Sequence, residues 1–178
     1  MKLDPHDKVG TLSKGQSSRL ALLLAMAHRP RVVILDDPTL GLDPIARRDF
    51  LRHVIGLLQD QGATVFFSSH LLYEIEPICD QVAILHEGRI IKSAAVDHLR
   101  ASVKRVMFKP ADDASLDQVP GVLDVQRDNG QWAVTVEIID EARSSLAALG
   151  KGSETIVDLN LDEIFEAYVI GRREVSDD

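Results

Sequence analysis

Two acidic residues close the apolar run Arg31-Val32-Val33-Ile34-Leu35-Asp36-Asp37, and Pro38 follows them directly. An unbroken apolar run of this length is typical of a parallel β-strand that is buried on both faces and presents polar groups at its carboxyl end. Because proline has no backbone N–H to donate, Pro38 prevents the strand from continuing. We therefore predict a buried parallel strand that ends at Asp36 and Asp37.

A helix and a second strand follow this run. Residues 45–61 carry apolar side chains at helical spacing, and Gly62 follows as a stop signal. Residues 63–70 repeat the apolar strand pattern and end at His70. A strand, a helix and a strand in this order form a crossover unit, which predicts a parallel sheet. The carboxyl ends of neighbouring parallel strands gather at one site, so we expect His70 to lie near Asp37.

The C-terminal part has a different pattern and a different charge. Basic and acidic residues balance in the first 100 residues, so the whole net charge of −8 lies in residues 101–178. The expected elements are a strand at 105–109, a short helix at 115–119, a hairpin through Asn129-Gly130, a helix at 141–149, a strand at 155–159 and a helix at 161–170. This order predicts a small α+β, ferredoxin-like domain. We expect an α/β domain at 1–103 and this accessory domain at 104–178.

Composition excludes several classes of protein. A net charge of −8 argues against a protein that binds nucleic acid, and 45% hydrophobic residues indicate a globular chain. The longest apolar run, Leu20–Ala27, is far shorter than the roughly 20 residues of a membrane-spanning helix. The first residues contain no apolar signal-peptide region, and Cys79 has no second cysteine to pair with. A cytoplasmic location is the resulting expectation.

The pentapeptide Leu12-Ser13-Lys14-Gly15-Gln16 opens a predicted helix. A serine at a helix start can direct its hydroxyl, the free backbone N–H groups and the positive end of the helix at a phosphate, and Gly15 lets the backbone approach closely. The alternative is a capped helix start without a ligand, because serine is also a favoured N-cap residue. The pentapeptide alone leaves both interpretations open.

Four motifs together resemble the C-terminal portion of an ABC-transporter ATPase subunit. They are similar, in the family's order, to the signature, the Walker B strand, the D-loop and the switch histidine, at Leu12–Gln16, Val33–Thr39, Gly41-Leu42-Asp43-Pro44 and Ser69-His70. The resemblance implies a P-loop-NTPase-like parallel sheet core that is incomplete in this chain. It also implies ATP as ligand, with Mg²⁺.

The resemblance assigns a role to each matching position. The residues that would face the ATP of a partner subunit are Ser13, Lys14, Gly15, Gln16 and Asp43. Asp36 would hold Mg²⁺, and Asp37 and His70 would place the attacking water. The family normally has glutamate where this chain has Asp37, and a carboxylate that is displaced by about 1 Å can cost on the order of 100-fold in rate. The shorter side chain of Asp37 therefore extends its carboxylate less far toward the attacking water than a glutamate would.

The P-loop motif Gly-x-x-x-x-Gly-Lys-Ser/Thr is absent from the printed sequence. We expect a truncated ATPase subunit that does not hydrolyse ATP by itself. Two alternatives stay open: a short subunit that lends its signature to the P-loop of a partner, and a non-enzymatic regulatory or assembly module of an ABC complex.

The segment Leu161–Glu166 resembles the closing helix of the accessory domain that follows the ATPase in many drug- and natural-product-type bacterial exporters. The alternative is an ordinary amphipathic terminal helix. The resemblance implies an exporter, in which a second ATPase subunit and a membrane-spanning subunit are the partners. The chain would then lie on the inner face of the cell membrane. In this family the membrane subunit selects the transported substrate.

Overall fold

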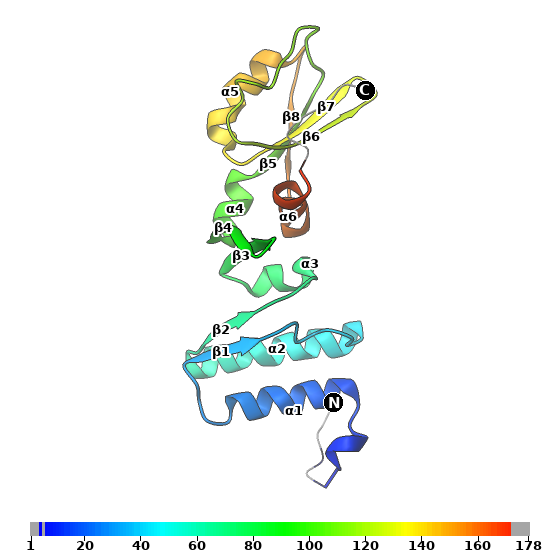
Figure 1. The fold of residues 1–178 in the computed structure, drawn as a ribbon, viewed down its shortest axis with the longest axis vertical. Coiled ribbons are helices and arrows are strands. Elements are labelled where there is room, and N and C mark those ends of the chain that lie inside the picture. Colours follow the sequence, from blue (N-terminus) through cyan, green and yellow to red (C-terminus); the bar gives the residue numbers. More distant parts are fainter. Residues whose placement is uncertain (1–3, 5, 172–178) are drawn as a thin grey trace. The chain divides into compact units, whose positions relative to one another are not determined.

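The computed structural model describes residue 4 and residues 6–171, and residues 57–61 only by their backbone. The chain forms two compact units, Met1–Leu71 and Leu72–Asp178. The first unit contains a 3₁₀ turn η1 (Val9–Thr11), α1 (Lys14–Met26), β1 (Val32–Leu35), α2 (Pro44–Gln61) and β2 (Thr64–Phe67). Figure 1 shows these elements in blue and cyan.

The predicted crossover unit is confirmed in Met1–Leu71. Strands β1 and β2 pair in parallel, with Val33 opposite Val65 and Leu35 opposite Phe67, and α2 connects them. The strands are short because Pro38 follows the two acids after β1, and the polar residues Ser68, Ser69 and His70 follow β2.

The prediction that β1 is buried on both faces is wrong. Val33 is 5% exposed, whereas Ile34 is 75% exposed and its register partner Phe66 is 63% exposed. Successive strand residues point to opposite faces, so the unit covers one face of its two-stranded sheet and leaves the other open. The buried apolar residues of this unit are Leu22, Met26, Val33, Leu42, Phe50, Leu51, Val54 and Ala63.

The second unit begins with α3 (Leu72–Ile75), a 3₁₀ turn η2 (Glu76–Ile78), β3 (Gln81–His86), β4 (Arg89–Ala95) and α4 (Val96–Ser102). It continues with β5 (Lys104–Phe108), β6 (Val122–Asp128), β7 (Gln131–Val136), α5 (Ile139–Leu149), β8 (Thr155–Asp158) and α6 (Leu161–Val169). Strands β3 and β4 form an antiparallel hairpin. The other four strands form one sheet with the order β6-β7-β5-β8.

The four-stranded sheet has the predicted ferredoxin-like connectivity. Strand β7 lies between β5 and β6 and is antiparallel to both, which is the split arrangement. The hairpin at Asn129-Gly130 is confirmed, with φ of +48° and +75° as the tight turn requires. The predicted helix at 115–119 is wrong. That segment lies between Pro110 and Pro120 and forms turns, because proline disfavours a helical residue before it.

Two apolar clusters hold the second unit together. One lies on the four-stranded sheet and α5, with Val106, Val134 and Leu146 fully buried. The other joins the segment 72–103 to α6, and its buried members include Leu99 and Ile164. The packing boundary therefore lies after Leu71, earlier than the limit expected after residue 103. The division into an ATPase-like domain at 1–103 and an accessory domain at 104–178 stays a prediction.

Candidate functional site

Polar side chains meet where β1 and β2 end. The Ser68 hydroxyl donates to Asp36 Oδ1 at 2.7 Å and accepts the backbone N–H of Asp37, also at 2.7 Å. The ring nitrogen His70 Nδ1 lies 2.8 Å from Asp37 Oδ2. The crossover connection thus brings together the three residues that the sequence analysis singled out at these strand ends. Ser68 was not among the candidate residues, although its place two residues before His70, directly after β2, was a usable signal.

Asp37 is held in an unusual conformation. Its φ is +39°, in the left-handed region that aspartate tolerates better than most residues do. Its side chain is 24% exposed, and the oxygen Oδ1 is buried with no hydrogen-bond partner in the part of the chain that the structure describes. A buried acceptor without a partner is costly, so an incoming water or other donor would be stabilised there. The imidazole of His70 is 55% exposed and can meet a ligand.

Asp36 could contribute to a magnesium site. Asp36 is exposed at the end of β1, and its Oδ1 accepts a hydrogen bond from the Ser68 hydroxyl. Mg²⁺ is commonly bound through one or two carboxylates, with water and phosphate oxygens as the other ligands. Among the described residues no group of three or more His, Cys, Asp or Glu side chains could hold a metal ion. The Asp36 carboxylate fits Mg²⁺ that takes most of its ligands from water and phosphate oxygens.

The start of α1 is a complete capping box. Ser13 is the N-cap, its oxygen accepts from Gln16 N–H at 3.3 Å, and Gln16 Oε1 accepts from Ser13 N–H at 2.9 Å. The capped helix start is thus confirmed. The cap leaves the Ser13 hydroxyl hydrogen and the first N–H groups of the helix, at Lys14 and Gly15, as donors without an intrahelical acceptor. An anion can therefore still bind at this helix end.

The turn before α2 contacts the start of α1. A Cβ built on Gly41, where φ is +70°, would collide with the Lys14 ammonium group, so this lysine lies against the turn of its own chain. The Asp43 carboxylate accepts from the N–H groups of Ile45 and Ala46 at 3.0 and 2.9 Å and caps α2. Asp43 is therefore engaged locally in this structure, and its role toward a partner stays a prediction.

Comparisons with known proteins find one matching family model and several similar relatives. A model of the family described as "AAA domain, putative AbiEii toxin, Type IV TA system" matches residues 8–76. The uncharacterized ABC transporter ATP-binding protein YdbJ of Bacillus subtilis is 47% identical over 85 residues, which are 48% of this chain and 28% of YdbJ. The bacitracin transport ATP-binding protein BcrA of Bacillus licheniformis is 32% identical over 154 residues, which are 86% of this chain and 50% of BcrA.

A solved structure shows a partial likeness. It is that of cbiO1 from Clostridium perfringens, part of the ABC transporter complex cbiONQ, with 30% identity and a TM-score of 0.48 over 52% of this chain and 37% of that chain. The present chain is a homologue of ABC transporter ATP-binding proteins. The matches span 28% of the length of YdbJ and 50% of that of BcrA. Within the described residues, no helix is long and apolar enough to cross a membrane.

Proposed function

We propose that this chain supplies the signature, magnesium-binding and water-positioning parts of the ATPase of an ABC exporter. ATP binding and hydrolysis would drive transport through a separate membrane-spanning subunit. The observation that carries the proposal is the contact of His70 with Asp37 beside the Ser68–Asp36 pair, at the carboxyl ends of two adjacent parallel strands. The relatives whose names include ATP binding support it.

Each residue would have a defined task in this site. Asp36 would hold Mg²⁺, which would neutralise charge on the phosphates when it is bound with ATP. Asp37 Oδ2 accepts from His70 Nδ1–H, which fixes the imidazole, and Oδ1 would accept a hydrogen from the attacking water. The Ser13 hydroxyl and the first N–H groups of α1 would donate to the phosphates of ATP held by a second subunit.

The phosphate-binding loop has to come from polypeptide outside the printed 178 residues, because no Gly-Lys-Ser/Thr occurs in them. The open face of the first unit supports this part of the proposal. Ile34 and Phe66 are mostly exposed there, and parallel sheets normally have both faces covered. A further segment that packs on this face would cover the exposed side chains. It could also place the P-loop beside the strand ends.

The partners would be a second ATPase subunit, identical or not, and a membrane-spanning subunit, so the chain would lie on the cytoplasmic face of the membrane. The second unit supports the assignment to an exporter, since its last helix resembles that of exporter accessory domains. The match to BcrA also extends over 86% of this chain, beyond the first unit.

The test is ATP hydrolysis by the complex isolated from the cells that make the chain, purified in detergent through a C-terminal tag on the chain. We expect Mg²⁺-dependent hydrolysis that falls by about 100-fold in His70→Ala, because the imidazole positions the water. The matched control is His98→Ala, an exposed histidine on α4. The isolated 178-residue chain should show no hydrolysis.

Two outcomes would change the proposal. Hydrolysis that survives His70→Ala but is lost in Ser13→Ala would favour the alternative of a subunit that only donates its signature to a partner. Hydrolysis that neither substitution affects would contradict the proposal and favour a regulatory or assembly module.

A further inference from the structure

Ser68 is held by its own backbone at a place from which its side chain reaches both strand-end acids. It follows the last residue of β2, and its backbone N–H donates to the carbonyl oxygen of Leu35 at 3.0 Å, which continues the pairing of β1 with β2. Leu35 is the last residue of β1, directly before Asp36 and Asp37. The strand pairing therefore fixes Ser68 beside two residues that lie 32 and 31 positions away in the chain.

The Ser68 hydroxyl joins the side chain of one acid to the backbone of the other. A carboxylate can only accept, so the hydroxyl hydrogen must lie on Asp36 Oδ1. A backbone N–H can only donate, so the Asp37 N–H must be directed at a lone pair of Ser68 Oγ. Both distances are 2.7 Å. A hydroxyl group donates and accepts at the same atom, whereas alanine at this position would do neither.

The hydrogen bond to Asp37 acts on a strained backbone. The φ of Asp37 is +39°, and such a conformation persists only where the surroundings hold it. Ser68 Oγ accepts the N–H of this residue, and its carbonyl oxygen accepts the N–H of Leu40 at 3.0 Å. The Asp37 carboxylate that this backbone presents contacts His70. Loss of the Ser68 acceptor would therefore loosen the residue that orients the imidazole.

The hydrogen bond to Asp36 distinguishes the two oxygens of that carboxylate. Because the Ser68 hydroxyl engages Oδ1, Oδ2 is the oxygen that can bind a cation without competition from the hydroxyl hydrogen. Mg²⁺ demands near-ideal octahedral geometry, so the orientation of a carboxylate ligand matters. A side chain that is already held in its bound orientation also loses less conformational freedom when the ligand arrives.

We propose that Ser68 is a positioning residue that joins the cation-binding acid to the water-positioning acid of the candidate site. Its hydroxyl holds the Asp36 carboxylate in the orientation in which it takes up Mg²⁺, and it holds the Asp37 backbone in the conformation that presents its carboxylate to His70. Ser68 acts through the two acids rather than on the ligand. The link between the acids rests on the two hydrogen bonds alone, whereas its effect on Mg²⁺ rests on the proposed function.

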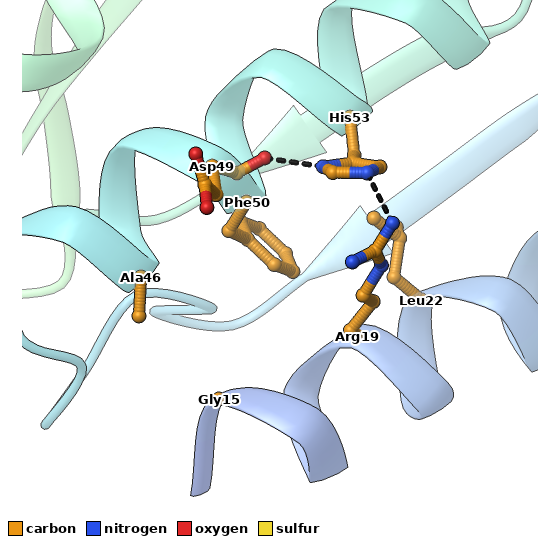
Figure 2. Close-up of a pocket in the computed structure, with 7 residues that line it drawn as sticks. All are labelled: Gly15, Arg19, Leu22, Ala46, Asp49, Phe50 and His53. Carbon is orange, nitrogen blue, oxygen red and sulfur yellow. Dashed lines mark hydrogen bonds between the residues drawn. The ribbon is translucent and has the colours of Figure 1, made fainter. Parts of the chain in front are cut away.

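Two other polar contacts show what is particular to Ser68. Figure 2 shows Arg19 on α1 reaching His53 on α2 in a small pocket, so this contact joins two helices rather than two strand ends. In the second unit, the Ser115 hydroxyl donates to Asp117 Oδ2 at 2.8 Å and accepts the Asp117 N–H at 3.3 Å. Ser115 thus makes the same two types of contact with a residue only two positions away. Ser115→Ala is therefore a matched control.

The first test is amide hydrogen exchange at Asp37 in the full 178-residue chain, followed by NMR. In Ser68→Ala the Asp37 N–H loses its acceptor, and we expect it to exchange about fivefold faster, the size expected for loss of one net hydrogen bond. Ser68→Thr keeps the hydroxyl and should stay within about twofold of the natural chain. In Ser115→Ala the Asp117 N–H should exchange faster, and that of Asp37 should not. Equal exchange of the Asp37 N–H in the natural chain and in Ser68→Ala would overturn the proposal.

A measurement on the natural chain decides the matter even if Ser68→Ala does not fold. The chemical shift of the Asp37 amide proton should change little with temperature, as it does for a hydrogen-bonded amide. The amides of β7 that pair with β5 serve as the reference for this behaviour. A temperature dependence typical of an amide exposed to water would overturn the proposal.

The second test varies the concentration of free Mg²⁺ during ATP hydrolysis by the isolated complex. We expect Ser68→Ala to raise the Mg²⁺ concentration at half-maximal rate about fivefold, and Ser68→Thr to restore it. A merely structural role would lower the maximal rate through a smaller active fraction and would leave this concentration unchanged. Ser115→Ala should alter neither value. An unchanged half-maximal concentration in Ser68→Ala would overturn the role toward Mg²⁺.

The two tests separate this proposal from the proposed function. If Ser68→Ala frees the Asp37 N–H but the ATPase ignores His70→Ala and Ser13→Ala, the link between the acids is retained and the proposed function is rejected. If the ATPase depends on His70 but Ser68→Ala changes neither the Asp37 exchange nor the Mg²⁺ dependence, the proposed function is retained and the link is rejected.

Discussion

The two units differ in how they bury their apolar side chains. In Leu72–Asp178 the clusters contain many fully buried side chains, including Val134, Leu146 and Ile164. In Met1–Leu71 the buried side chains are fewer, and Ile34 and Phe66 lie open on the sheet. All the candidate site residues belong to the more open unit. The second unit thus buries its apolar side chains within itself, whereas the first leaves one sheet face open and carries the strand ends and helix ends to which the proposed function assigns a ligand.

The largest expected effect compares two isoleucines. Ile164→Ala removes a side chain with 0% exposure and should destabilise the second unit by about 2–5 kcal/mol. Urea unfolding followed by the fluorescence of Trp132, which lies in β7 of that unit, measures this change. Ile34→Ala removes a side chain with 75% exposure and should alter the stability of the first unit by no more than about 0.5 kcal/mol, as measured by hydrogen exchange in β1 and β2. Equal losses at the two positions would mean that the open sheet face is covered in solution.

The two capping boxes offer a comparison of intermediate size. Asn160 accepts from Glu163 N–H at the start of α6 as Ser13 does at the start of α1. Replacement of either cap by alanine should cost about 1 kcal/mol of stability in its own unit, because a helix N–H loses its acceptor. Asn160→Ala should leave the ATPase rate of the isolated complex unchanged, whereas Ser13→Ala should reduce it. If both Asn160→Ala and Ser13→Ala reduced the ATPase rate, the reduction would be due to lost stability rather than to a role of Ser13 in the signature.

A smaller effect concerns the only cysteine. Burial, with a further contribution from the negative charge of Asp80, raises the pKa of the Cys79 thiol, so less thiolate is present at pH 8 than in a free cysteine. Alkylation by iodoacetamide should therefore be slower in the native chain than in the chain unfolded in urea. The Ile164→Ala variant is the control that links the two measurements, since it loosens the cluster against which Cys79 packs. Equal alkylation rates in native and unfolded chains would show that this edge of the second unit is open.

The smallest expected effect is a surface ion pair. A hydrogen bond from Lys104, and then the charge of that lysine, lower the pKa of Asp158. A lowered pKa in the folded state gives stability above the pKa of the unfolded state, which is lost as the pH falls through the folded value. Asp158→Asn should therefore be slightly less stable than the natural chain at pH 7, and the difference should vanish in acid, at a pH below the lowered pKa of Asp158 in the folded state. Because the pair is exposed, added salt should also shrink it. A stability difference between Asp158→Asn and the natural chain that persists in acid would show that the charge of Asp158 is not its cause.

Much of the fold was predictable because local rules act within a few residues. The acids after β1, the Asn129-Gly130 turn and the last helix follow from strand runs, turn chemistry and helical spacing. The two wrong predictions, the burial of β1 and the helix at 115–119, depend on neighbouring parts of the chain rather than on the segment itself. The apolar run of β1 predicted two covered faces, yet exposure depends on which elements pack on the sheet. The helix predicted at 115–119 did not form between its two prolines.

The sequence by itself determined the family resemblance and the candidate site residues other than Ser68. The four motifs at Leu12–Gln16, Val33–Thr39, Gly41–Pro44 and Ser69-His70 need only their order and residue types to be recognised. Only the tertiary structure decided that His70 contacts Asp37, that Ser68 links both acids, and that Arg19 meets His53. The reason is that these pairs are more than 30 residues apart in the chain, so they meet only when the crossover connection and the packing of α1 on α2 have formed.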